Sequence, residues 1–119
     1  MQIYGSRKCQ ITRKAERFFN ERNIPYHFVD LTKYTPSRGE LDNMKKRLPP
    51  GESLIDPESP AFKKRGLTYM IYDEIDEILT NPLLLKTPIV REASRVIVGH
   101  DEAAWKALAG EIRQGVFKR

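Results

Sequence analysis

A change of hydrophobic period within the first 31 residues limits the possible folds more than any other feature. Residues 2–5 form a short strand-like segment. Residues 26–31 alternate and are rich in aromatic and branched side chains, as strands are. Between them, apolar residues recur at i, i+4, i+7 and i+8 on one face of a helix that should end near Asn23: Ile11, Ala15, Phe18 and Phe19. This order predicts a right-handed βαβ unit.

The middle of the chain predicts a helical insertion. Ser37 and Glu40 have the spacing of a capping box, and the helix that they open should end before the Pro-Pro-Gly sequence at 49–51. Ser59 precedes a proline at the first helical position of a short helix that runs to Gly66. Asp73 should cap a further helix, which residues 81–82 close.

The C-terminal third predicts a hairpin and a last helix. Residues 89–91 and 95–98 alternate and are joined by the short connection 92–94, as in an antiparallel hairpin. Residues 101–112 have helical spacing and should pack on the sheet through Trp105. The sum is an α/β chain with a thioredoxin-like fold, in which a four-stranded mixed sheet carries a helical insertion at about residues 37–82.

Composition favours one small protein unit. A length of 119 residues with 39% hydrophobic residues suits a single domain over 1–119. No apolar run reaches about 20 residues and no signal peptide is visible, so we expect a cytoplasmic protein. We also expect a monomer. The net charge of +5 favours anionic partners in general, although a solvated basic surface is the preferred explanation, because charged residues are mostly exposed. No motif for reading DNA or RNA is present, so nucleic acid is not an expected partner.

The single cysteine, Cys9, is the candidate reactive group. One cysteine excludes an internal disulfide framework and a cysteine-rich zinc site. The two histidines, His27 and His100, have no partners at ligand spacing, so we expect no metal site. If Cys9 takes part in redox chemistry, its partner thiol therefore belongs to another molecule.

Cys9 lies between the first strand and the first helix, where unpaired N–H groups and the helix dipole favour a negative charge. Arg7, Lys8 and Arg13 add positive potential, and the Thr12 hydroxyl can face the sulfur from the first helical turn. These features should lower the pKa of the Cys9 thiol below the free value of about 8.5. The same N–H groups could hold an oxyanion or a carboxylate. The alternatives are a small buried core cysteine and an ordinary helical position for Thr12.

Thr87 and Pro88 open the predicted hairpin. A proline that starts a strand directly after a loop is a candidate for a cis peptide bond, although an ordinary trans proline is the commoner case. With a cis bond, an extended peptide such as glutathione could pair with the backbone of Thr87.

Several short motifs, in order, resemble the arsenate reductase family, which also includes Spx-type regulators and uncharacterised arsenate reductase-like proteins. The resemblance covers nearly the whole chain. It rests on Ile3-Tyr4 before Cys9-Gln-Ile-Thr12-Arg13, on residues 36–41, on Asn81-Pro82-Leu-Leu, and on Lys86-Thr87-Pro88-Ile-Val followed by Val98-Gly99 and Trp105.

The resemblance implies a thioredoxin-like fold with a cis bond at Pro88. It also implies a mechanism in which the Cys9 thiolate attacks an oxidised substrate, and glutathione, as cosubstrate, or glutaredoxin then resolves the adduct. We therefore take Cys9, Thr12 and Arg13 as candidate catalytic residues. The candidate residues for binding substrate or glutathione are Arg7, Lys8, Thr87, Pro88, Arg91 and Arg95.

Three positions depart from the classical glutathione-linked arsenate reductases. Gly5 stands where that family has a histidine, Thr87 where it has an arginine, and Val98-Gly99 near the place of another arginine. Arsenate is therefore one candidate substrate among small oxyanions and oxidised thiols. Arg7, Lys8, Arg91 and Arg95 could supply substitute charge.

The leading hypothesis is a glutathione-dependent thiol oxidoreductase of arsenate reductase-like type. The alternative is a non-catalytic regulator like Spx, which would bind a protein partner such as RNA polymerase. Spx-type regulators usually carry Cys-x-x-Cys, and Thr12 interrupts that pattern here. A thioredoxin-fold protein that binds glutathione without turnover is the third possibility.

Overall fold

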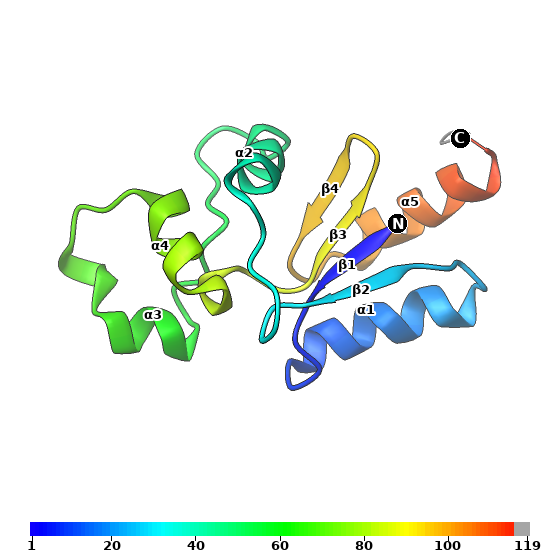
Figure 1. Cartoon of the computed structure of the whole chain (residues 1–119). Helices are drawn as coiled ribbons and strands as arrows, with labels where there is room; N and C mark the ends of the chain where they lie inside the picture. Colours follow the sequence, from blue (N-terminus) through cyan, green and yellow to red (C-terminus); the bar gives the residue numbers. More distant parts are fainter. Residues whose placement is uncertain (116–119) are drawn as a thin grey trace. The chain divides into compact units, whose positions relative to one another are not determined.

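A computed structural model describes residues 1–115 of the chain (Figure 1). Four short strands are present: β1 (Gln2–Gly5), β2 (His27–Asp30), β3 (Ile89–Glu92) and β4 (Arg95–Val98). The α-helices are α1 (Gln10–Glu21), α2 (Arg38–Lys46), α3 (Pro60–Arg65), α4 (Glu74–Thr80) and α5 (Glu102–Arg113). Two short 3₁₀ helices are η1 (Leu67–Tyr69) and η2 (Pro82–Leu84). No helix among residues 1–115 combines the length and the apolar character that crossing a bilayer requires.

The strands form one mixed sheet in the order β2-β1-β3-β4. β1 runs parallel to β2, with Ile3 opposite Phe28, and antiparallel to β3, with Ile3 opposite Val90. β3 and β4 form the antiparallel hairpin. This topology confirms the predicted fold class, in which a parallel N-terminal unit and a C-terminal hairpin share four strands.

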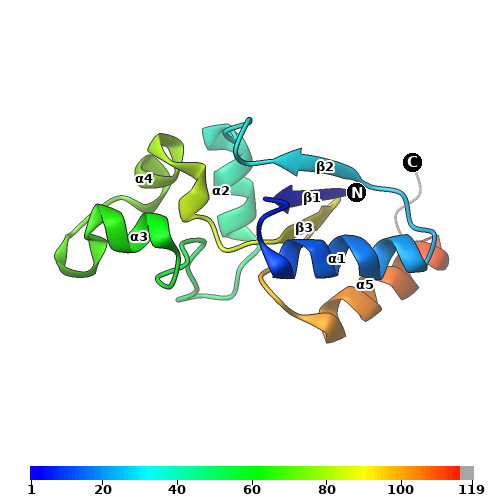
Figure 2. The ribbon, with the colours of Figure 1, turned by 90° about the horizontal axis from the view of Figure 1, so that it is seen from below.

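Helices α1 and α5 cover the same face of the sheet, as Figure 2 shows. The apolar stripe of α1 supplies Ala15, Phe18 and Phe19 to a core that includes Ile3 and Val90 from the sheet. Trp105 and Leu108 of α5 are fully buried in the same cluster. The predicted packing of the last helix on the sheet is therefore confirmed.

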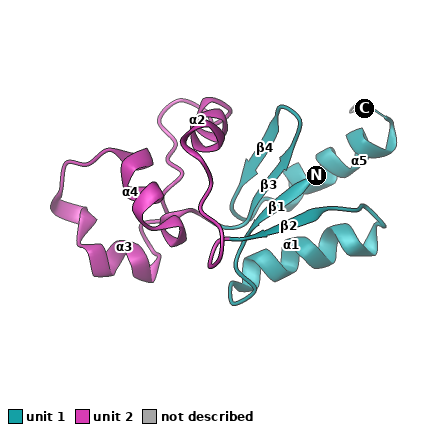
Figure 3. Cartoon of the chain, viewed as in Figure 1, with its two compact units in different colours: residues 1–30, 87–119 teal, residues 31–86 magenta. Residues whose placement is uncertain are grey.

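The chain divides into two compact units (Figure 3). Unit 1 comprises Met1–Asp30 and Thr87–Arg119, and it holds the sheet with α1 and α5. Unit 2 is Leu31–Lys86, which contains the helical insertion expected at about 37–82. The expectation of a single domain over 1–119 stays a prediction.

Capping residues fix the helices of unit 2. Ser37 and Glu40 form the complete capping box that their spacing predicted, since each side chain pairs with the backbone N–H of the other residue. The side chains of Ser59 and Asp73 accept hydrogen bonds at the starts of α3 and α4. The left-handed backbone of Gly66, with φ of 72°, ends α3.

Two local features differ from the sequence analysis. Glu92 belongs to β3, so the hairpin connection is shorter than 92–94 and consists of Ala93 and Ser94. Ala93 has a positive φ of 51°, as a tight hairpin turn requires. The 3₁₀ helices η1 and η2 were not predicted, because a segment of three residues is too short to display a hydrophobic period.

Candidate functional site

Cys9 is the N-cap residue of α1, at the carboxyl end of β1. Its backbone is extended, with φ of −84° and ψ of 120°, and its N–H donates to the Ser6 carbonyl over 2.9 Å. Its own carbonyl accepts from Arg13 N–H, which begins the helix. The cysteine is free and partly exposed. The sulfur therefore lies at the helix N-terminus, where the dipole favours a negative charge.

Two threonine side chains, each from a different element, interact with the Cys9 sulfur. The hydroxyl of Thr87, at the residue before β3, donates to Sγ over 3.2 Å. Thr12, in the first turn of α1, is fully buried, and its side chain is one of the groups that lower the pKa of the Cys9 thiol. Residues 78 positions apart in the sequence thus meet at one sulfur atom.

The balance of these contacts lowers the pKa of the Cys9 thiol. Partial burial alone would raise it, because desolvation disfavours the thiolate. The side chains of Thr12 and Thr87 and the backbone N–H groups of Thr12 and Ile11 favour the thiolate and outweigh that effect. Hydrogen-bond donors, most of them from the helix N-terminus, are therefore the main cause of the lowered pKa.

The nearby cations have other contacts or are exposed. The Arg7 guanidinium lies 4.4 Å from the centre of the Phe28 ring and 3.8 Å from a Glu16 oxygen. Lys8 and Arg13 are exposed. Arg13 lines a surface hollow of about 400 Å³ on α1 with four other residues of that helix: Gln10, Ile11, Lys14 and Arg17. Because Arg13, Lys14 and Arg17 are cationic, the surface of the first turns of α1 is positively charged.

Arg91 and Arg95 lie on the hairpin. Arg91 pairs in register with Gln2, at the start of β1. Cys9 lies beyond the opposite end of that strand, which is Gly5. Its guanidinium donates to the Tyr4 hydroxyl over 3.1 Å. Arg95 forms an ion pair with Glu111 of α5 over 2.8 Å. Both of these contacts lie within unit 1, and neither is with Cys9.

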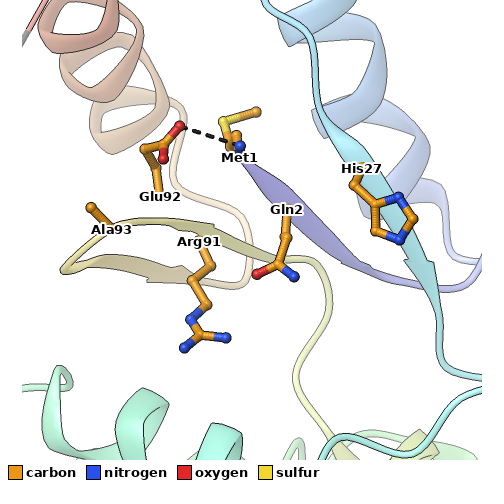
Figure 4. A pocket seen from close by; sticks show the side chains of 6 residues that line it. All are labelled: Met1, Gln2, His27, Arg91, Glu92 and Ala93. Carbon is orange, nitrogen blue, oxygen red and sulfur yellow. Dashed lines mark ion pairs between the residues drawn. The ribbon is translucent and has the colours of Figure 1, made fainter. Parts of the chain in front are cut away.

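Arg91 also lines a polar cavity of about 450 Å³ with five other residues: Met1, Gln2, His27, Glu92 and Ala93 (Figure 4). The Tyr4 hydroxyl accepts from Arg91 and donates to Gln2 Oε1, so it connects these two side chains. Glu92 pairs instead with the N-terminal ammonium over 3.3 Å. Within residues 1–115, no three His, Cys, Asp or Glu side chains lie close enough to hold a metal ion.

The bond between Thr87 and Pro88 is cis, as the sequence analysis expected. The sequence analysis assigned Thr87 to cosubstrate binding and did not foresee the contact between its hydroxyl and the sulfur. No local signal could have revealed that contact, because it depends on the pairing of β3 with β1.

Known proteins share this fold and, more distantly, this sequence. No protein-family model matches the chain. The global transcriptional regulator Spx 2 of Oceanobacillus iheyensis is 29% identical over 84% of this chain and 76% of that protein. A crystal structure of an ArsC family related protein from Bacteroides fragilis has a TM-score of 0.78 at 23% identity, covering 90% of this chain and 97% of that one. Arsenate reductase from Vibrio cholerae has a TM-score of 0.72 at 19% identity, covering 91% and 96%.

Proposed function

We propose that the chain is a thiol oxidoreductase of the arsenate reductase-like ArsC/Spx family, on the basis of its structural neighbours and its distant Spx relatives. Cys9 is its nucleophile. An external thiol, glutathione or the thiol of a glutaredoxin, resolves the adduct on Cys9, since the chain has a single cysteine.

One observation carries this proposal: the Cys9 sulfur is partly exposed and accepts hydrogen bonds at the N-terminus of α1. Thiolate, rather than thiol, is the reactive form, and donors that lower the pKa increase the thiolate fraction near neutral pH. Thr12 and Thr87 are the residues that stabilise it. The cationic surface on the first turns of α1, with Arg13, favours the approach of an anionic substrate or of glutathione.

For a disulfide substrate, the proposed cycle has three exchange steps. The Cys9 thiolate attacks one sulfur, forms a mixed disulfide and releases the other sulfur as a thiolate. A glutathione thiolate then attacks the Cys9 sulfur, which releases the second substrate thiolate and leaves Cys9 bound to glutathione. A second glutathione thiolate attacks the glutathione sulfur, so that oxidised glutathione leaves and the Cys9 thiolate returns. Two glutathione molecules supply the two electrons that the substrate gains.

The pH dependence of Cys9 alkylation tests the reactive state directly. The rate of reaction with iodoacetamide should rise with pH to a midpoint below about 8.5, the value for a free cysteine. The same protein unfolded in urea serves as the reference, and Cys9→Ser gives the background rate. A folded-state midpoint equal to or above that of the unfolded chain contradicts the proposal.

Activity assays then separate the substrate classes. The protein, with glutathione and glutaredoxin, is offered either a small disulfide or arsenate, and Cys9→Ser is the matched control. We expect Cys9-dependent turnover of the disulfide. Turnover of arsenate as well would extend the substrate class. If neither substrate is reduced although the alkylation midpoint is low, Cys9 is a reactive thiol but the proposed reductase activity is wrong.

A second candidate function is regulation, because the similar protein Spx 2 of Oceanobacillus iheyensis is named a global transcriptional regulator. In that case the chain binds a protein partner such as RNA polymerase, and Cys9 acts at most as a sensor. The discriminating experiment is a pull-down with wild type and Cys9→Ser. Recovery of RNA polymerase by both proteins favours regulation over catalysis.

A further inference from the structure

We propose that Gly5 is a positioning residue: the missing side chain at the end of β1 leaves the space in which Thr12 stands beside the Cys9 sulfur. This inference rests on the proposed role of Cys9 as a thiolate nucleophile, and it adds a residue of that site outside the Cys-x-x-Thr motif.

The geometry leaves no room for a β-carbon at residue 5. A Cβ built on Gly5 would lie 2.4 Å from Thr12 Oγ1, 2.6 Å from Thr12 Cγ2 and 3.1 Å from Thr12 Cβ. Rotation about χ1 does not relieve the contact, because each staggered rotamer of Thr12 still places a γ atom in at least one of these two positions. The described glycines with a positive φ are Gly51, Gly66, Gly99 and Gly115. Gly5 is not among them, so space, and not backbone conformation, requires a glycine here.

The sheet holds Gly5 in place, so a new methyl group would displace Thr12. Gly5 is buried and pairs in register with Asp30 of β2, at the end of the parallel ladder. Thr12 lies in the first turn of α1, three residues after the N-cap, where intrahelical hydrogen bonds are fewest. Of the two elements, the helix start is the one that yields more easily.

Displacing Thr12 has a chemical consequence at Cys9. The Thr12 hydroxyl is fully buried, and no residue in 1–115 forms a hydrogen bond with it in this structure. A buried hydroxyl without a partner costs free energy, and a thiolate at Cys9 is a stronger acceptor that would satisfy it. The Thr12 side chain is accordingly one of the groups that lower the pKa of Cys9. A threonine moved away from the sulfur would favour the protonated thiol.

The variant Gly5→Ala tests the inference. We expect its alkylation midpoint to move to higher pH, and its alkylation rate at pH 7 to fall roughly threefold to tenfold, the size expected for losing one ordinary hydrogen bond. Thr12→Ala should show a similar shift, because it removes the same donor. A folded Gly5→Ala protein with the wild-type midpoint overturns the inference.

The double variant separates positioning from a general loss of structure. In Gly5→Ala/Thr12→Ala the two colliding γ atoms are gone, so the protein should fold like Thr12→Ala and share its alkylation midpoint. A further rise of the midpoint, or failure of the double variant to fold when Thr12→Ala folds, contradicts the inference. If Gly5→Ala alone does not fold, the comparison of the double variant with Thr12→Ala still tests the inference.

Gly110→Ala is the matched control. Gly110 lies inside α5, and a Cβ there would meet nothing within 4 Å. This substitution should leave the alkylation profile unchanged. The two proposals can fail separately. An ordinary midpoint in the wild-type protein defeats the thiolate proposal, whereas a low wild-type midpoint that Gly5→Ala leaves unchanged defeats only the role of Gly5.

Discussion

Two hydroxyl groups, rather than charged side chains, interact with the reactive sulfur. Thr87 donates to Sγ over 3.2 Å, and Thr12 faces the sulfur from the first turn of α1. Neutral donors stabilise a thiolate without forming an ion pair with it, so the sulfur keeps its negative charge available for attack. The lowered pKa of Cys9 therefore depends on the exact placement of two small side chains.

Thr87→Val removes one of these donors and nearly preserves the shape of the side chain. We expect alkylation of Cys9 at pH 7 to slow roughly threefold to tenfold, because the thiolate loses one hydrogen bond. Iodoacetamide kinetics across pH measure the effect. The exposed Thr68 supplies the control, and Thr68→Val should react like wild type. Equal profiles for all three proteins would mean that the Thr87 hydroxyl does not stabilise the thiolate.

The sequence identifies the half of this site that is local. Cys9 and Thr12 are one helical turn apart, so their proximity follows from helix geometry alone. The contact of Thr87 with Cys9 spans 78 residues and needs the assembled sheet. The charge of Arg7 is visible in the sequence, whereas its position over the Phe28 ring is not, and its role in binding stays a prediction.

At the scale of elements, hydrogen bonds of Glu74 connect the start of α4 to the segment 53–55. Its carboxylate accepts from the Ser53 hydroxyl over 2.6 Å and from the backbone N–H groups of Leu54 and Ile55, and it pairs with Lys45 of α2. Its side chain is only 11% exposed. Burial raises the pKa of Glu74, but these hydrogen bonds outweigh burial and hold the pKa below its usual range.

Glu74→Gln should therefore destabilise unit 2, by about 1–3 kcal/mol at pH 7, since a charged acceptor of several hydrogen bonds is lost. Because the folded pKa lies below the unfolded value of about 4.3, the contribution is fully present above that value and disappears as pH falls through the folded pKa. The difference between variant and wild type should thus be constant near neutral pH and shrink in acid.

Hydrogen exchange of the Leu54 and Ile55 amides measures this loss locally, and urea unfolding by circular dichroism measures it globally. Glu58→Gln is the control, because the Glu58 side chain is 84% exposed and pairs with Lys63 over 3.6 Å. If the Leu54 and Ile55 amides exchange equally in wild type and Glu74→Gln, the carboxylate does not anchor this segment.

Helix starts were predicted well because their signals are local. Ser37, Ser59, Asp73 and Asp101 each cap the helix that follows them, through a side-chain oxygen that accepts from a backbone N–H two or three residues inside the helix. The division of the chain into two units has no such signal. It arises from which apolar faces meet in space, which a single sequence does not specify.

At the scale of the whole molecule, unit 1 depends on a core assembled from both ends of the chain. Phe19 is fully buried, with its ring centre 5.0 Å from that of Phe18 and 6.5 Å from that of Trp105. Trp105 is the single tryptophan, so its fluorescence reports on this core. The site at Cys9 should exist only while the core is intact.

Phe19→Ala should lower the free energy of unfolding by about 3–5 kcal/mol, the usual cost of removing a buried phenylalanine. In urea, the loss of Trp105 fluorescence and the rise of the Cys9 alkylation midpoint to about 8.5 should coincide, and both should occur at lower urea in the variant. Leu83→Ala, at a side chain that is 44% exposed, should unfold close to wild type. A midpoint that rises well before the fluorescence changes would separate the site from the core.

The contact between Thr87 and Cys9 also has a consequence for synthesis of the protein. A ribosome makes Cys9 early and Thr87 nearly 80 residues later, and the strand that begins after Thr87 must be free of the exit tunnel before it can pair with β1. Until then the nascent chain lacks one of the hydrogen-bond donors that lower the pKa of the Cys9 thiol. The cysteine thus acquires its full reactivity only once β3 has paired with β1, when the folded sheet controls which molecules can approach that sulfur.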